Sequence, residues 1–139
     1  MKRNYCLLSI TSLVIGIGIY VLFRNSEMLL FQWAPKLKFI NSIYMPIEYS
    51  IISSMFLFNL SDALWFLSGI LFIRYLWFYK IKEMLIYLLC FYLVGIIFEI
   101  SQLSRNIPGT FDTLDLVFMS IAAFFEGLLY NFFVKRRFV

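Results

Sequence analysis

The chain has 139 residues, a length that suits a single domain. Apolar residues make up 63% of it, aromatic residues 21% and charged residues 14%, against about 25% charged residues in an average soluble domain. A soluble fold of this length could not bury so much apolar surface, so the composition excludes an ordinary soluble protein and indicates a membrane protein. The net charge of +4 does not indicate nucleic-acid binding, because the basic residues are scattered at the ends of apolar runs.

The first apolar run extends without a charge from Tyr5 to Phe23 and has basic residues on both sides. It is long enough to cross the hydrocarbon core of a bilayer. The alternative is a cleaved signal peptide, which would have a shorter apolar core and a cleavage site of small residues. Ser26 is the only small residue near the end of the run, so we predict an uncleaved span over residues 5–23.

Residues 24–60 have a less regular pattern, because charged residues and two prolines, Pro35 and Pro46, interrupt the apolar residues. The apolar stretch from Ile47 to Leu60 is short for a span and contains several polar residues. We predict that residues 24–60 form an interfacial or re-entrant segment in the outer leaflet. A fifth span within residues 40–60 is the alternative.

Three further spans are predicted over residues 61–79, 84–100 and 113–133. Ser61 or Asp62 can cap the first of these helices, and Trp65 and Trp77 lie near its two ends, as expected of aromatic belts. The predicted fold is therefore all-α, with four transmembrane helices in one domain that covers residues 1–139.

The distribution of basic residues predicts the orientation. With the N-terminus in the cytoplasm, eight Lys and Arg residues fall on or toward the cytoplasmic side and four fall outside. Most acidic residues show the opposite preference. We therefore predict a multi-pass protein of the bacterial cytoplasmic membrane with both termini in the cytoplasm, in contact with membrane lipids and not with nucleic acid.

The densest polar segment runs from Glu99 to Asp115, between two apolar runs, with a turn at Pro108-Gly109. The turn folds the last two helices against each other, and the short connection near Lys80 returns Asp62 to the same height. We expect these polar residues to gather at the outer end of the bundle, with Arg105 or a backbone donor as the partner of Glu99. The predicted outer polar cluster consists of Asp62, Trp65, Glu99, Gln102, Arg105, Asp112 and Asp115. The alternative is that these residues only cap helices or interact with helix dipoles.

Two charged residues lie deeper in the predicted spans. Arg74 is about 18 Å below Asp62, and Glu126 is about 16 Å below Asp115, at 1.5 Å per helical residue. An unpaired Arg inside a membrane costs about 2.5–3.5 kcal/mol on insertion scales. We therefore predict that Arg74 and Glu126 form a structural pair. A path for ions along the acidic face of the last helix is the alternative.

Few groups suited to catalysis or metal binding are present. There is no histidine, and the serines and threonines therefore have no imidazole base nearby. The sequence contains no phosphate loop, dinucleotide fingerprint or thiol pair, and Cys6 and Cys90 are interpreted as packing residues. The outer acids come from three helices without a spacing that defines a coordination geometry. We expect no catalytic residue, no metal site and no cofactor.

Three polar motifs, in this order and spacing, resemble the VanZ-like family of small bacterial integral membrane proteins, named after a protein linked to teicoplanin resistance. They are Asn59-Leu60-Ser61-Asp62-Ala63-Leu64-Trp65, Glu99-x-x-Gln102 and Pro108-Gly109-Thr110-Phe111-Asp112-x-x-Asp115. The resemblance covers residues 59–130. Ala63 stands where the family has a lysine, and Met119 and Ala122 stand where it has asparagine and glycine.

The resemblance implies a protein of the cell envelope with a role related to antibiotic resistance. The favoured function is an outward polar cleft that interacts with an envelope lipid, a glycopeptide-like molecule or a protein partner. One alternative is a small structural subunit of a larger transport or secretion complex. Another is a membrane enzyme that acts on a lipid-linked substrate, although we expect a non-enzymatic protein.

Overall fold

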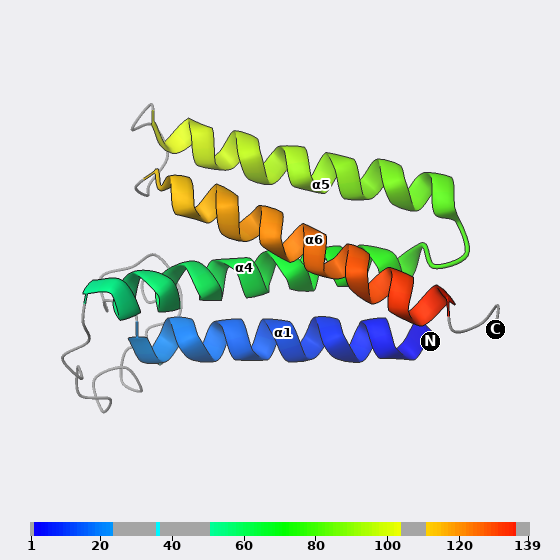
Figure 1. Ribbon diagram of the computed structural model, residues 1–139, viewed down its shortest axis with the longest axis horizontal. Coiled ribbons are helices and arrows are strands. Elements are labelled where there is room, and N and C mark those ends of the chain that lie inside the picture. The colour runs from blue at the N-terminus through cyan, green and yellow to red at the C-terminus, as the bar shows by residue number, and fades with distance from the viewer. Residues whose placement is uncertain (1, 24–35, 37–50, 104–110, 136–139) are drawn as a thin grey trace.

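The computed structural model describes residues 2–23, 36, 51–103 and 111–135, and four long helices account for nearly all of them (Figure 1). They are α1 (Lys2–Phe23), α4 (Ile51–Leu76), α5 (Ile81–Gln102) and α6 (Thr113–Lys135). Each contains a segment long and apolar enough to cross a membrane. The predicted all-α membrane fold with four spanning helices is confirmed.

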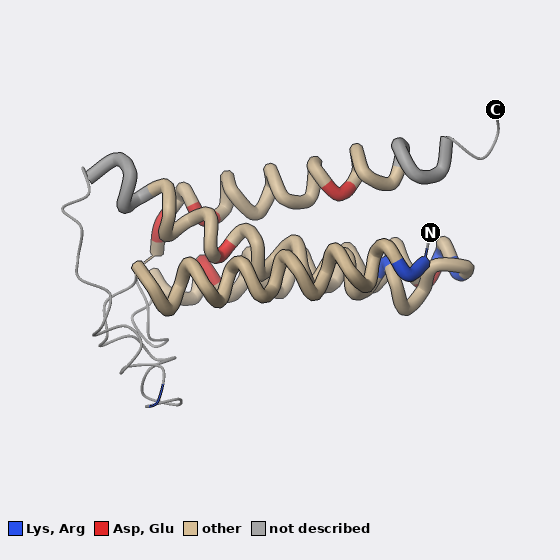
Figure 2. The backbone as a smooth tube through the Cα atoms, turned by 90° about the horizontal axis from the view of Figure 1, so that it is seen from below, with Lys and Arg blue, Asp and Glu red and all other residues tan. Residues whose placement is uncertain are grey.

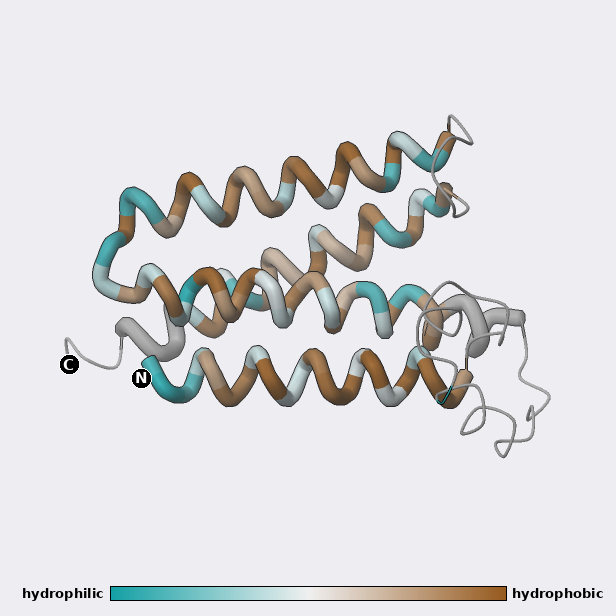
Figure 3. The backbone as a smooth tube through the Cα atoms, turned by 180° about the vertical axis from the view of Figure 1, so that it is seen from behind, coloured by the Kyte–Doolittle hydropathy of each residue, from teal (hydrophilic) through white to brown (hydrophobic). Residues whose placement is uncertain are grey.

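Successive helices run in opposite directions, so the start of α1 and the end of α6 lie at the same end of the bundle (Figure 1). Helix α4 is the central element, because it packs against the other three. Within its spanning window 44% of the residues are buried inside the protein, against 6% for α5. The outer faces of α1 and α5 expose large apolar side chains, which is expected where the surrounding solvent is lipid. Apolar residues occupy most of the length of both helices (Figure 3).

Small residues on α1 explain its close packing along α4. Ser9, Ser12 and Gly16 are buried and follow one another at helical spacing, so they form one face. The Ser9 hydroxyl donates a hydrogen bond to the Ser68 carbonyl at 2.9 Å. A Cβ atom at Gly16 would lie 2.4 Å from Cδ1 of Trp65, so only glycine allows this approach. Small residues and interhelical hydrogen bonds of this kind associate helices in membranes.

Aromatic residues and methionine fill the core between α4, α5 and α6. Phe66 of α4 stacks on Phe91 of α5 with ring centroids 5.0 Å apart. Met119 of α6 points its methyl group at Gly95, where a Cβ atom would lie 2.3 Å away. Ala122 is buried on the same face of α6.

The start of the second helix differs from the prediction. Helix α4 begins at Ile51, and Ser61 and Asp62 therefore lie in its interior and do not cap it. The Ser61 hydroxyl donates to the Phe58 carbonyl at 2.8 Å within the helix. Asn59 and Ser61 are buried against the neighbouring helices, which lets the helix continue through a polar stretch that resembles a helix start.

The predicted outer-leaflet segment is accordingly shorter than expected. Residues 51–60 belong to α4 and form no separate fifth span. The remainder of that prediction, over residues 24–35 and 37–50, lies outside the described residues.

Candidate functional site

Acidic residues from three helices gather at one end of the bundle (Figure 2). Glu99 lies in the last turn of α5, Asp62 lies in α4, and Asp112 immediately precedes α6. The charges of Asp62 and Asp112 both act on Glu99, so each of these two carboxylates lies within electrostatic reach of Glu99. We call Asp62, Glu99 and Asp112 the acidic cluster.

Glu99 is the least well satisfied member of the acidic cluster. Its Oε1 atom accepts a hydrogen bond of 3.4 Å from the Gln102 side chain. Its Oε2 atom is buried and has no hydrogen-bond donor among the described residues. The predicted partner, Arg105, lies outside those residues. A buried carboxylate oxygen without a donor is unfavourable, and the negative end of the α5 dipole adds to this cost.

Asp112 has a clear structural role. One of its carboxylate oxygens accepts a hydrogen bond from the Leu114 backbone N–H at 2.9 Å, so Asp112 is the N-cap of α6. Asp115 lies in the first turn of the same helix, where a negative charge interacts favourably with the dipole. The capping interpretation therefore holds for Asp112, whereas Glu99 and Asp62 are not explained by it.

Trp65, one helical turn after Asp62, packs against α1. Its ring stacks on Tyr20 at a centroid distance of 5.2 Å and lies against Gly16. Because α4 begins well before Ser61, Trp65 lies within the helix and not near its start. Its role is to join α1 to α4.

The opposite end of the bundle carries basic residues (Figure 2). Lys80 and Lys82 are exposed at the connection between α4 and α5. The ammonium group of Lys2 lies 4.9 Å from the centre of the Tyr75 ring. The described part of the chain is thus electrically asymmetric along its long axis.

Arg74 and Glu126 form the predicted ion pair between α4 and α6. The Arg74 Nη2 atom donates to Glu126 Oε2 at 2.8 Å, and Nε donates to Oε1. Their exposed fractions are 6% and 4%, so the pair is buried in the protein. Two parallel hydrogen bonds between a guanidinium and a carboxylate give the strongest geometry available to such a pair.

Three residues around this ion pair were not predicted from the sequence. The Arg74 guanidinium lies 4.1 Å from the centre of the Tyr130 ring and 3.2 Å from the sulfur of Met84. Tyr5 of α1 is fully buried and interacts electrostatically with both charged partners. All four helices therefore meet at one polar centre. The spacing of Glu126 and Tyr130, one helical turn apart, is the only sequence signal that could have suggested part of it.

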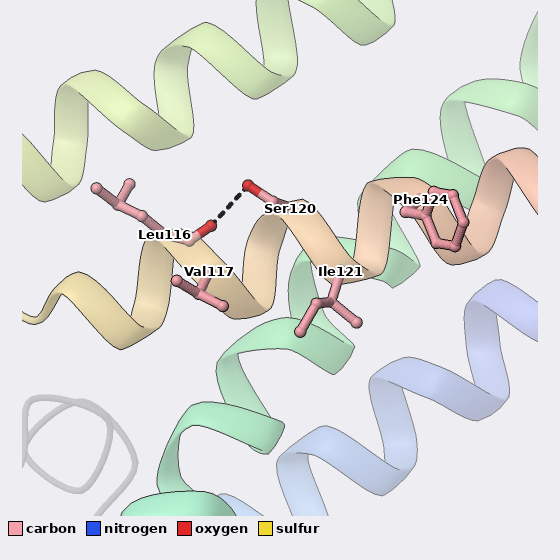
Figure 4. Close-up of a pocket in the computed structure, with 5 residues that line it drawn as sticks. All are labelled: Leu116, Val117, Ser120, Ile121 and Phe124. Carbon is pink, nitrogen blue, oxygen red and sulfur yellow. Dashed lines mark hydrogen bonds between the residues drawn. The ribbon is translucent and has the colours of Figure 1, made fainter.

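A shallow groove of about 420 Å³ runs along the outer face of α6 (Figure 4). It is lined by Leu116, Val117, Ser120, Ile121 and Phe124. The Ser120 hydroxyl is 2.8 Å from the Tyr92 hydroxyl of α5 and 2.8 Å from the Leu116 carbonyl. This groove was not predicted, because its residues have the composition of ordinary lipid-facing positions.

Among the residues that the structure describes, no group of three or more acidic or cysteine side chains is placed to hold a metal ion. A comparison of the chain with protein-family models, with curated proteins and with solved structures finds no match.

Proposed function

We propose that this chain is a VanZ-like protein of the bacterial cytoplasmic membrane whose acidic cluster faces outward and binds an amine- or hydroxyl-bearing molecule of the cell envelope. The family part of this proposal rests on the motifs around Asp62, Glu99 and Asp112. The first motif is far from the other two in the sequence, and the fold brings Asp62 and Asp112 within electrostatic reach of Glu99.

The observation that carries the proposal is the buried Oε2 atom of Glu99, which lacks a donor among the described residues. A carboxylate can only accept hydrogen bonds, and Asp62 and Asp112 add negative charge around it. A ligand that supplies an ammonium or several hydroxyl groups would satisfy this oxygen and offset the repulsion. A head group with a net negative charge and no ammonium group would increase the repulsion, so the site selects against such heads.

The outward orientation is supported by the charge asymmetry. Basic residues mark the side of a membrane protein that stays in the cytoplasm, and Lys2, Lys80 and Lys82 all lie at the end opposite to the acidic cluster. The acidic cluster is then accessible to molecules of the envelope.

The proposal is tested by the teicoplanin susceptibility of bacteria that express the protein. Expression of the wild type should raise the minimal inhibitory concentration, and Glu99→Gln should abolish this effect at the same protein level in the membrane. Gln keeps the shape of Glu but removes the charge that the ligand would pair with. The matched control is Glu83→Gln, which makes the same change at an exposed position at the other end of the same helix.

Equal protection by the wild type and Glu99→Gln would contradict the proposal, because the charge of Glu99 would then have no functional role. A wild type that gives no protection would contradict the link to glycopeptides.

A second candidate function, a small subunit of a larger membrane complex, is favoured by the exposure of α5. Only 6% of its spanning window is buried inside the protein, which leaves most of its surface available to another chain. The two candidates differ in whether the protein purifies alone in detergent or together with other chains.

A further inference from the structure

The groove on α6 and the acidic cluster lie along one line. Asp112, Leu116, Ser120 and Phe124 follow one another at intervals of four residues, so they form a continuous row along one side of the helix. Asp112 is at the N-terminal end of this row and lies within electrostatic reach of Glu99 on α5. The groove begins one turn below Asp112 and continues to Phe124.

The groove opens toward the bilayer and not toward the core. Val117 is 50% exposed, Ile121 is 55% exposed and Phe124 is 69% exposed, whereas the core-facing Met119 and Ala122 are buried. Its occupant must therefore come from the lipid phase and must be apolar over most of its length. A volume of about 420 Å³ is within the range of small-molecule sites, about 300–1,000 Å³.

The length of the groove fits a chain that belongs to one leaflet. Leu116 and Phe124 are eight residues apart, which is about 12 Å along a helix. One leaflet of a bilayer provides about 15 Å of hydrocarbon, half of the total core. An acyl chain in the groove would place its head group near the start of α6, where the carboxylates lie.

We propose that the side of α6 that carries this row binds an amine-headed phospholipid, with an acyl chain in the groove and the ammonium group at Asp112 and Glu99. This inference rests on the proposed function and names the ligand class for the same site. The two parts of the site make separate demands: the groove requires a chain, and the carboxylates require a cationic head. A lipid with a hydroxyl-bearing anionic head meets the first demand and not the second.

The test measures lipids retained by the full chain in detergent, by native mass spectrometry. The probes are dioleoyl-phosphatidylethanolamine, which has an ammonium head, and dioleoyl-phosphatidylglycerol, which has the same chains and an anionic head without an amine. The wild type should prefer phosphatidylethanolamine by about tenfold or more, the effect of one charge-assisted hydrogen bond.

Two classes of variant separate the head from the chain. Asp112→Asn should remove the preference while the helix stays capped, because Asn caps as well as Asp. Ile121→Trp should fill the groove and reduce retention of both lipids, and Val117→Trp provides an independent variant of the same kind. The matched control is Leu89→Trp at a position on α5 that is 59% exposed, which should retain lipid as the wild type does.

Unchanged binding of phosphatidylethanolamine in both groove variants would overturn the inference and leave the proposed function standing, because the acids would then bind their ligand without the groove. Equal retention of the two lipids by the wild type would overturn the choice of an amine head. The proposed function is judged separately by the resistance of cells that express Glu99→Gln.

Discussion

Glu99 shows how a single residue departs from what stability alone would favour. Its carboxylate lies at the negative end of a helix, close to two other acids, and one of its oxygens is buried. Each of these features is energetically unfavourable for a charged carboxylate. Asp112, which follows Glu99 by thirteen residues, is the opposite case, since its side chain accepts a hydrogen bond from a backbone N–H at the start of α6. Residues that break local rules without a visible structural benefit are the ones most often kept for function.

The capping role of Asp112 gives a prediction of its own. Asp112→Ala should lower the free energy of unfolding by about 0.5–2 kcal/mol, because the Leu114 N–H loses its acceptor, whereas Asp112→Asn should leave it nearly unchanged. Unfolding in detergent, followed by circular dichroism, measures both variants. An equal decrease in the free energy of unfolding for the two variants would show that the charge of Asp112, and not its capping hydrogen bond, stabilises α6.

The site could be predicted only in part from the sequence. Spacing and the Pro108-Gly109 turn were sufficient to bring Glu99 toward Asp112, and the known rise of a helix was sufficient to pair Arg74 with Glu126. The packing of Trp65 against α1 was missed, and the start of α4 was placed wrongly. Tyr5 and Met84 were missed because, in a run of apolar residues, nothing distinguishes a side chain that contacts a buried charge from one that contacts lipid.

At the scale of elements, the polar centre around Arg74 joins all four helices. Each helix contributes one or more of its members: Tyr5 from α1, Arg74 from α4, Met84 from α5, and Glu126 and Tyr130 from α6. Removal of one charge leaves the other buried and unpaired, which is far worse than removal of both. Stable packing of α6 against the rest of the bundle therefore requires that Arg74 and Glu126 pair.

Substitutions of Arg74 and Glu126 should have non-additive effects on the stability of the protein. Arg74→Met should destabilise the protein by about 3–5 kcal/mol, because Glu126 stays behind without a partner, while the double variant with Glu126→Met should recover most of the loss. Unfolding of the purified protein in detergent and sodium dodecyl sulfate measures the difference. A double variant at least as unstable as Arg74→Met would contradict the account of this centre.

The contact between α1 and α4 gives a prediction with a matched control in the same helix. Gly16→Ala should lower the stability by about 1–3 kcal/mol, because the added methyl group would overlap Trp65. Gly18→Ala should be neutral or stabilising by up to about 1 kcal/mol, since nothing lies within 4 Å of a Cβ atom there. Tryptophan fluorescence during thermal unfolding reports both, and equal effects would contradict the packing described for Gly16.

The bounds of the helices illustrate where sequence patterns fail. The starts and ends of α1, α5 and α6 were predicted to within a few residues, because charged residues flank their apolar runs. The start of α4 was not, because Asn59, Ser61 and Asp62 resemble a helix start. Burial of Asn59 and Ser61 inside the bundle could not be read from the sequence, since it depends on which helices lie beside them.

For the whole molecule, the main feature is the separation of charge between the two ends. The acidic cluster lies at one end of the bundle, and Lys2, Lys80 and Lys82 lie at the opposite end. Because successive helices run in opposite directions, every second connection between helices lies at the same end of the bundle. The separation of charge follows from this topology. It predicts a fixed orientation in the membrane.

Both proposals require that the acidic end face outward, and cysteine labelling of intact cells tests this most directly. Cys6 and Cys90 are first replaced by alanine, and single cysteines are introduced at the exposed positions Leu103, near the acidic cluster, and Lys82, at the basic end. A reagent that does not cross the membrane should label the cysteine at position 103 in intact cells and the one at position 82 only after the cells are opened. Labelling of position 82 and not of position 103 in intact cells would contradict the account.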